Sequence, residues 1–300
     1  MPDERKAQLR KKALSFFGNE VLFLGVILII FTIIKIVPFI NSFIYSFTDW
    51  NGVSAKLNFT GLDNFKLMAK DAQFWSSMWF TAKMSLAILV GENLLGFILA
   101  YFLTKPLRAR NIIRAGFYLP NVLGGLILGF IWRFIFVKIV PAIGKATGLS
   151  LFKLVWLGTP ATAFWALVIV SIWSHLGYYM LLYVAGFTSI PGDCVESARM
   201  DGASNLKILF KVKLPLLMPT ITRCLFLSVT TSFRVYNLNL SLTDGGPFNA
   251  SEAVTMNIYR TAFTEYQMGY GSAKSLILSL VVICITLFQV WATSRKEVDL

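Results

Sequence analysis

Six long stretches of this chain are almost entirely apolar, and they restrict its possible folds more than any other feature. They cover residues 20–40, 76–103, 113–136, 162–186, 220–241 and 272–293. Each is close to the roughly 20 apolar residues that an α-helix needs to cross a hydrocarbon core. No alternation of apolar and polar residues favours strands instead. The sequence therefore predicts an all-α, polytopic membrane protein with six transmembrane helices, its membrane domain extending over residues 20–293.

The composition agrees with this class, since 56% of the residues are hydrophobic and only 14% are charged. A soluble domain of 300 residues needs more polar surface than that. The first apolar stretch follows basic residues, as in a secretory signal, but it is too long for one and no small-residue cleavage site follows it. We expect it to be the first spanning helix.

Lys and Arg are distributed unevenly between the connecting segments. Fifteen of them fall in the N-terminal segment 1–19, the alternate loops on the same side and the tail 294–300, against seven in the remaining loops. Loops rich in these residues are retained in the cytoplasm, so both termini are predicted to be cytoplasmic. The same distribution accounts for the net charge of +13, and no basic run has interleaved aromatic residues outside the spans. We therefore expect membrane lipid, and no nucleic acid, around this chain.

Side chains that carry metal or catalytic chemistry are scarce. The three cysteines are Cys194, Cys224 and Cys284, and the chain has a single His. These are too few ligands for a Cys/His metal site, and no nucleophile, base and orienting acid occur at a convincing spacing. The chain also lacks a Gly-x-x-x-x-Gly-Lys-Ser/Thr loop for phosphates. We expect neither a bound metal or cofactor nor enzyme activity in this chain.

The segment 190–219 between the fourth and fifth apolar stretches has the pattern of two short helices outside the membrane. Pro191 suits a helix start, and Asp193 with Glu196 three residues later has the spacing of a capping box. Gly202 interrupts the helical pattern, and Asp201 beside it is a candidate cap for a second helix. The sequence therefore predicts a helix–turn–helix in this loop. From these residues alone, a surface for another protein and an ordinary amphipathic surface helix remain alternatives.

The residues of this loop carry a specific resemblance. The run Glu196-Ser197-Ala198, Asp201-Gly202-Ala203 and Leu214-Pro215 resembles the Glu-Ala-Ala loop of permeases in binding-protein-dependent ABC importers, with Ser197 where that family has Ala. The segment 242–247, Leu-Thr-Asp-Gly-Gly-Pro, resembles the carbohydrate branch of the same family. The sequence is most similar to the first permease of a maltose-type pair. This resemblance implies the architecture of a type I importer permease.

The resemblance also implies partners and roles. It implies a bacterial inner-membrane importer in which this chain forms a heterodimer with a second permease, two ATP-binding cassette subunits hold ATP and Mg, and a periplasmic binding protein delivers a carbohydrate. The loop is then similar to a coupling helix that docks on an ATPase subunit. The residues that this role assigns to ATPase coupling are Glu196, Ser197, Ala198, Asp201, Gly202 and Ala203.

Polar residues inside apolar stretches predict where a substrate passes, because they are costly in lipid and persist mainly where they face a cavity or a partner. Ser171, His175 and Tyr178 share one face of the fourth helix by their spacing. His175 is either in this path or a hydrogen-bonding residue between helices. The resemblance adds Arg234, from the part of the fifth helix that lines the sugar site in this family. The candidate path is Ser171, His175, Tyr178, Ser232, Arg234 and Asn237.

Glu92 in the second helix leaves an alternative open, because a lone intramembrane carboxylate is also typical of proton-coupled secondary carriers. We expect it to be paired with a cation, such as one from the partner permease, or to be neutral. Cations outnumber it, and an acidic oligosaccharide such as alginate fits if Arg234 and one further cation face the cavity. The cations in or near the spans are Lys35, Lys83, Arg133 and Arg234.

One pair of small residues, Gly125 and Gly129, has the spacing of a helix-packing motif. Its partner helix is either within the chain or in the second permease, and the sequence favours neither.

Overall fold

The computed structural model describes residues 24–295, and every regular element in that range is helical. The predicted segment 1–19 and most of the predicted tail 294–300 lie outside the described residues. The elements, with π-helical turns labelled η, are η1 (Thr32–Ile36), α2 (Val37–Tyr45), α3 (Asp63–Ala69), α4 (Ala72–Leu103), α5 (Arg110–Val122), α6 (Gly125–Phe134), η2 (Ile135–Ile139), α7 (Val140–Thr147), α8 (Ser150–Lys153), α9 (Pro160–Thr188), α10 (Gly192–Met200), α11 (Asn205–Ile208), η3 (Leu209–Lys213), α12 (Leu214–Leu216), α13 (Met218–Ser232), α14 (Tyr236–Leu242), α15 (Val254–Tyr259), η4 (Arg260–Thr264) and α16 (Met268–Ser294).

Five helices are long and apolar enough to cross a membrane, and a bent pair makes a sixth candidate. The five are Leu24–Tyr45, α4, Gly125–Thr147, α9 and α16. The bent pair is Asn205–Leu216 with Met218–Ser232, and the chain bends by 68° between them. The predicted all-α membrane architecture is therefore confirmed.

Two of the predicted continuous helices are broken in the structure. The stretch 113–136 is divided between α5 and α6, with extended backbone at Leu123 and Gly124. Pro120 in the last turn of α5 weakens the helix there because proline has no N–H to donate. The stretch 220–241 is divided between α13 and α14 at residues 233–235. Continuous helices over these two stretches were wrong predictions, and the span after α5 is Gly125–Thr147.

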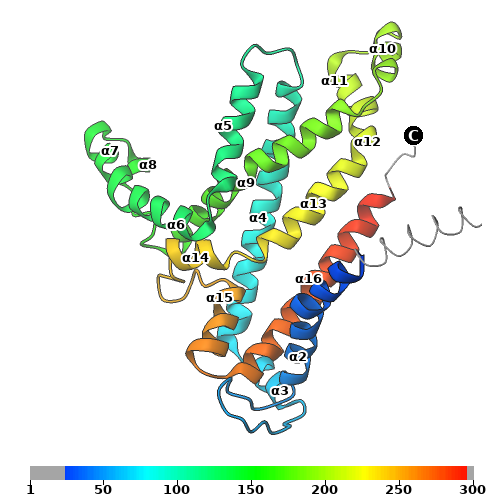
Figure 1. The fold of residues 1–300 in the computed structure, drawn as a ribbon. Coiled ribbons are helices and arrows are strands. Elements are labelled where there is room, and N and C mark those ends of the chain that lie inside the picture. The colour runs from blue at the N-terminus through cyan, green and yellow to red at the C-terminus, as the bar shows by residue number, and fades with distance from the viewer. Residues whose placement is uncertain (1–23, 296–300) are drawn as a thin grey trace, which may run out of the picture.

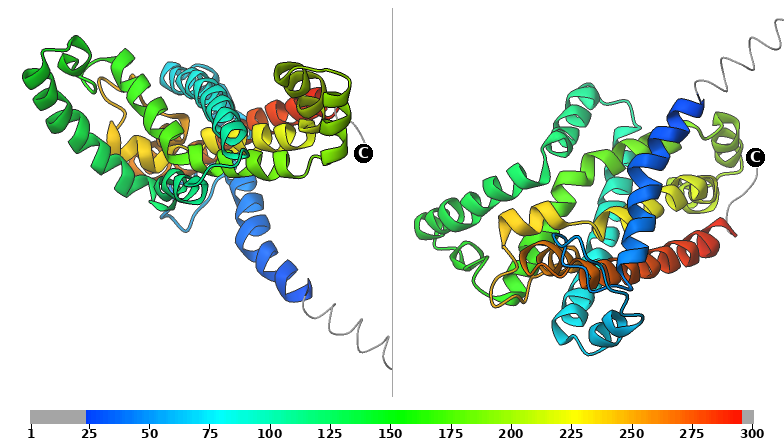
Figure 2. Two further views of the ribbon diagram at one scale, coloured as in Figure 1. Left: turned by 90° about the horizontal axis from the view of Figure 1, so that it is seen from above. Right: turned by 60° about the horizontal axis from the view of Figure 1, so that its bottom comes forward.

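The two longest helices, α4 and α9, form the centre of the bundle (Figure 1). α5 and α13 pack on this pair, and α16 lies beyond α13 with α2 against it (Figure 1). α6 to α8 extend away on the opposite side, as both views in Figure 2 also show. Most buried apolar side chains lie between α4, α9 and their neighbours. α2 buries none of its residues, as expected of a helix that faces lipid.

The small residues of α6 pack within the chain. A side chain added at Gly129 would overlap Ser241 of α14, and one at Gly125 would contact Asn237 of α14 at 3.4 Å. The helix-packing motif therefore joins α6 to α14, which decides between the two partners that the sequence left open.

The two ends of the bundle differ, and we name them by their short helices. The α10 end carries the α4–α5 connection and α10 to α12, and the α3 end carries α3, α15 and the start of α16 (Figure 1). At the α3 end, the ammonium of Lys274 is 2.9 Å from Asp71 Oδ2 and donates to Asn257 and Thr261, each at 2.9 Å. Lys274 is 2% exposed. Burial alone would raise the pKa of the Asp71 carboxyl, but hydrogen bonds from the Phe74 N–H, Tyr270 and Lys274 hold that pKa below its usual value.

A second buried acid extends this network. Glu252, which is 2% exposed, pairs through Oε1 with Arg260 at 2.9 Å. Its Oε2 accepts hydrogen bonds from Gln73 at 2.7 Å, Ser77 at 3.1 Å and Asn257 at 3.2 Å. Because Asn257 donates to Glu252 and accepts from Lys274, one network joins α4, α15, η4 and α16 at the α3 end.

Candidate functional site

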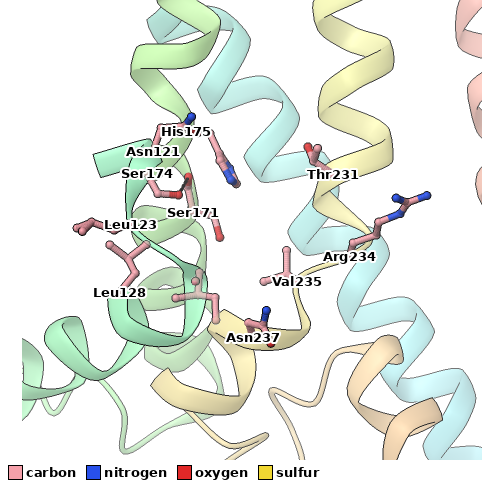
Figure 3. A pocket seen from close by; sticks show the side chains of 12 residues that line it. Asn121, Leu123, Leu128, Ser171, Ser174, His175, Thr231, Arg234, Val235 and Asn237 are labelled. Atoms are coloured by element: carbon pink, nitrogen blue, oxygen red, sulfur yellow. Dashed lines mark hydrogen bonds between the residues drawn. The ribbon is translucent and has the colours of Figure 1, made fainter. Parts of the chain in front are cut away.

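A cavity of about 250 Å³ lies where the broken helices meet. Its walls come from the end of α5, from α6, from the middle of α9, and from the break between α13 and α14 (Figure 3). Polar and apolar side chains alternate around it. Its lining residues are Asn121, Leu123, Gly125, Leu128, Ser171, Ser174, His175, Thr231, Arg234, Val235, Asn237 and Leu238.

Four of the six predicted path residues meet at this cavity: Ser171, His175, Arg234 and Asn237. Tyr178 and Ser232 are not among the lining residues. Tyr178 packs edge-on against Tyr179 instead, with ring centroids 5.6 Å apart. Ser232 is buried at the end of α13, where its hydroxyl donates to the carbonyl of Val229 at 3.2 Å. The helix break directly after Ser232 separates its direction from those of Arg234 and Asn237.

His175 connects the cavity wall to the buried interior. Its Nδ1 is 2.8 Å from Oε1 of Glu92, and Ser228 donates to the other oxygen of Glu92 at 2.9 Å. Glu92 is fully buried, whereas the His175 side chain is 38% exposed. The partner of Glu92 is therefore in its own chain, rather than in a second permease. The hydrogen bond to Glu92 fixes the direction of the imidazole, so His175 joins two helices and also lines the cavity.

The candidate path of six residues left out several lining residues, notably Asn121, Ser174 and Thr231. Asn121 reaches the cavity because α5 ends at Val122, and a continuous helix over 113–136 would carry it elsewhere. The Pro120-Asn121 and Gly124-Gly125 pairs were the only signals of that break. Ser171 is fully buried, and its hydroxyl has no hydrogen-bond partner among the described residues.

Of the four cations in or near the spans, Arg234 alone lines the cavity. Lys83 lies 5.8 Å from the centroid of the Trp79 ring on an exposed part of α4. Lys35 and Arg133 are also exposed on the bundle surface. The condition for an acidic sugar, that Arg234 and one further cation from this group face the cavity, is therefore not met.

The loop 190–219 contains the predicted helix–turn–helix, with different caps. α10 starts after Pro191, and Asp193 makes no capping hydrogen bond. Asp201 ends α10, and the second helix is capped by Ser204, whose Oγ accepts from the Lys207 N–H at 3.4 Å. The caps predicted at Asp193 and Asp201 were wrong, because Asp201 is already part of the turn that closes α10.

That turn requires glycine at one position. Gly202 has φ of +74°, which L-residues with side chains adopt at a cost. The Gly202 N–H donates to the carbonyl of Arg199 and the Ala203 N–H to that of Ala198, each at 3.0 Å. These are the two hydrogen bonds of a Schellman helix end.

The residues predicted to contact an ATPase lie on this hairpin at the α10 end (Figure 1). Glu196, Ser197, Asp201 and Gly202 are exposed, and Ala198 and Ala203 are half-buried. No described atom lies within 4 Å of the place where a Gly202 side chain would be. The structure leaves these residues accessible to another molecule.

Residues 92–298 match the family described as the inner membrane component of binding-protein-dependent transport systems. The chain belongs to this family. The matched range begins at Glu92 and includes the cavity, α10 and α16. A family member is a permease subunit of an ABC transporter in the inner membrane, so this permease is not an enzyme.

Two relatives cover nearly the whole permease. It is 43% identical to a probable starch degradation products transport system permease protein of Thermoanaerobacterium thermosulfurigenes, over 97% of this chain and 100% of that protein. It is 32% identical to a multiple sugar-binding transport system permease protein of Streptococcus mutans, over 92% of this chain and 95% of that protein.

The fold also matches solved structures. A bacterial ABC transporter involved in the import of the acidic polysaccharide alginate has a chain with a TM-score of 0.81 at 20% identity, covering 96% of this permease and 99% of that chain. A second structure, of an alginate ABC transporter in complex with a periplasmic protein bound to an alginate pentasaccharide, gives a TM-score of 0.78 at 21% identity. At these identities the likeness establishes the architecture of an ABC importer permease.

Proposed function

We propose that this permease and a second permease form the path through which an ABC importer moves neutral, starch-derived oligosaccharides into the cytoplasm. Two ATP-binding cassette subunits with ATP and Mg drive the cycle, and a periplasmic binding protein delivers the sugar. In this proposal the α10 end faces the cytoplasm, in agreement with the uneven distribution of Lys and Arg.

The cavity at the helix breaks is the observation that carries the proposal. Amide, hydroxyl and imidazole groups lie there beside Leu and Val side chains. Sugars present hydroxyl groups together with apolar ring faces, and a mixed wall of this kind complements both. Broken helices in a membrane are tolerated where they line such a cavity. A small single-chain cavity also fits a path that a second permease completes.

Three observations support a neutral substrate. Arg234 is the one Arg or Lys among the lining residues, and the remaining basic side chain, His175, is hydrogen-bonded to Glu92. The relative with 43% identity is named for starch degradation products. The similarity to alginate importers, at 20% and 21% identity, concerns the fold and not the sugar.

The proton-coupled carrier is disfavoured by the surroundings of Glu92. Both carboxyl oxygens are hydrogen-bonded within the chain, to His175 and Ser228, and the residue is fully buried. A proton carrier needs an acid that exchanges protons with water on each side in turn. Glu92 is better explained as the group that holds His175 in the cavity wall.

Uptake by the complete transporter in proteoliposomes tests the proposal. We expect the complex with its binding protein to accumulate labelled malto-oligosaccharides only with internal ATP, and Asn237→Leu to reduce uptake at least tenfold because it removes a polar group from the wall. Arg133→Gln, outside the cavity, is the matched control and retains uptake. Uptake driven by a proton gradient without ATP, or transport of uronic-acid oligomers alone, would overturn it.

A further inference from the structure

A second cavity, of about 470 Å³, lies at the α10 end. It is enclosed by the end of α4, the end of α9 and the inner face of the hairpin formed by α10 to η3. Three cations from different elements line it: Lys105 after α4, Arg199 on α10 and Lys213 on η3. Thr104, Thr188 and Asn205 add polar groups beside them.

No acid among the described residues pairs with the cations of this cavity. No Asp or Glu side chain lines it. None of the ion pairs found among residues 24–295 includes Lys105, Arg199 or Lys213. Lys213 is half-buried, which keeps water from screening its charge fully. Three cations gathered around one cavity repel one another unless an anion occupies it.

A general excess of cations on a cytoplasmic side does not explain this arrangement. Lys207 and Lys211 belong to the same hairpin but are exposed and do not line the cavity. Lys105 and Arg199 are exposed as well, but they line one cavity together with the half-buried Lys213, where water screens their repulsion less than on an open surface. Lys105 at the end of α4 is far in the sequence from Arg199 and Lys213 of the hairpin, so the fold brings these three cations to one cavity.

The remaining wall indicates what kind of anion fits. Tyr101, Phe187, Val195 and Ile208 give the cavity an apolar side next to the cations. The cavity also lies at the ends of two spanning helices, α4 and α9, which is the depth of lipid headgroups. Arg and Lys are the side chains that bind phosphate, and basic pockets between helices at this depth suit phosphorylated headgroups.

We propose that this cavity binds a phosphate group, carried either by an anionic phospholipid or by a free phosphate. A phosphate there bridges Lys105 at the end of α4 with Arg199 and Lys213 of the hairpin. It thereby fastens the hairpin to the bundle at the place where ATPase movements enter. The proposal goes beyond the transport function and does not depend on which sugar is carried.

The test uses the assembled transporter in nanodiscs of phosphatidylglycerol or phosphatidylcholine, with and without inorganic phosphate. Wild type is compared with Lys105→Gln/Lys213→Gln and with the control Lys207→Gln/Lys211→Gln, which removes the same charge from exposed positions. The readouts are the thermal unfolding midpoint and the phosphatidylglycerol retained per complex in native mass spectrometry. We expect phosphatidylglycerol to raise the midpoint of wild type and control, and the cavity variant to lose this shift. Its phosphatidylglycerol affinity should fall roughly thirtyfold, since each basic residue near an anionic headgroup contributes about a factor of five.

Each alternative has its own result. A shift produced by inorganic phosphate in phosphatidylcholine, and lost in the cavity variant, identifies free phosphate as the source and supports the site. An equal loss in the Lys207/Lys211 control would show a diffuse surface effect and overturn the proposal. The proposal is also overturned if neither phosphatidylglycerol nor inorganic phosphate raises the unfolding midpoint of wild type. Loss of the ATPase subunits from the cavity variant in every lipid would overturn it as well, because acidic groups of the ATPase would then balance the three cations.

Discussion

The two ends of this permease require glycine for different reasons. The difference shows that the α3 end is tightly packed within the chain and that the α10 end is exposed. At the α3 end, a side chain on Gly269 would overlap the carbonyl oxygen of Thr48, so the backbones must touch there. At the α10 end, the space next to Gly202 is empty, and glycine is needed for its φ of +74°. The α3 end is also joined by two ion pairs that each have one buried partner, Glu252 or Lys274, whereas the hairpin is closed by backbone hydrogen bonds.

This contrast suits the roles of the two ends. A network of buried charges fixes the relative positions of α4, α15, η4 and α16, because an unpaired buried charge is costly. The hairpin at the α10 end instead exposes Met200, which is 90% accessible, and the turn that follows it at Asp201 and Gly202 is also exposed. We infer that the α3 end moves as a unit while the α10 end is shaped for another protein.

The largest effect is expected at Lys274. Lys274→Met removes the cation of the half-buried Asp71 and the donor to the buried oxygens of Asn257 and Thr261, so the free energy of unfolding should fall by roughly 2–5 kcal/mol. Thermal unfolding of the purified complex, followed by size-exclusion chromatography, measures the shift. Lys83→Met is the control, since that ammonium is exposed and lies 5.8 Å from a Trp79 ring. Equal unfolding midpoints for Lys274→Met and Lys83→Met would show that the ion pairs do not make the α3 end more rigid than the α10 end.

A smaller loss is expected from Gly269→Ala. The added methyl group collides with the Thr48 carbonyl, and overpacking of this kind costs about 1–3 kcal/mol. Gly116→Ala on α5, where no atom lies within 4 Å, should be neutral or slightly stabilising in the same assay. If both alanines are tolerated alike, close backbone contact is not what holds the α3 end.

At the α10 end, Gly202→Ala should cost roughly 1–2 kcal/mol, because alanine is strained at positive φ. The effect stays local. We expect faster hydrogen exchange at the Ala203 amide, which bonds to Ala198, and an unchanged unfolding midpoint for the complex. Gly202→Asn is the matched control, since asparagine tolerates this conformation better. A lowered midpoint in Gly202→Ala would mean that the hairpin also braces the bundle.

The smallest effect is expected at the cap of α11. Ser204→Ala removes a 3.4 Å hydrogen bond and should cost about 0.5–1 kcal/mol. Hydrogen exchange at the Lys207 amide measures it, and Ser204→Asp keeps a capping oxygen. Protection that does not change in Ser204→Ala would show that this cap contributes nothing to the hairpin.

Apolar length was sufficient to predict most of the membrane fold, because hydrocarbon thickness sets a minimum that few other folds need. The breaks in the helices were missed because the apolar runs continue through Leu123 and Phe233. Pro120 weakens the end of α5 locally, and the packing of α6 on α14 through Gly129 and Ser241 is a tertiary contribution that the sequence does not show. The breaks in turn shaped the cavity, so Asn121 could not be identified from helical spacing.

Hydrogen bonds between residues far apart in the sequence could not be predicted either. Glu92 and His175 are separated by 83 positions, and nothing local indicates that they meet. Caps were difficult for another reason, since Asp201 and Ser204 are both good capping residues within four positions. The hydrogen bonds of the α10 turn assign Asp201 to the first helix and leave Ser204 for the second.

Sugar-stimulated ATP hydrolysis by the purified transporter in lipid tests most directly whether the hairpin couples the ATPases to this permease. Wild type is compared with Glu196→Lys/Gly202→Asp and with the control Gly192→Asp, which adds a carboxylate at an exposed position at the start of α10. We predict that the double variant assembles but loses stimulation by sugar and binding protein, while the control keeps it. Full stimulation in the double variant would contradict the assignment of the hairpin as the coupling element.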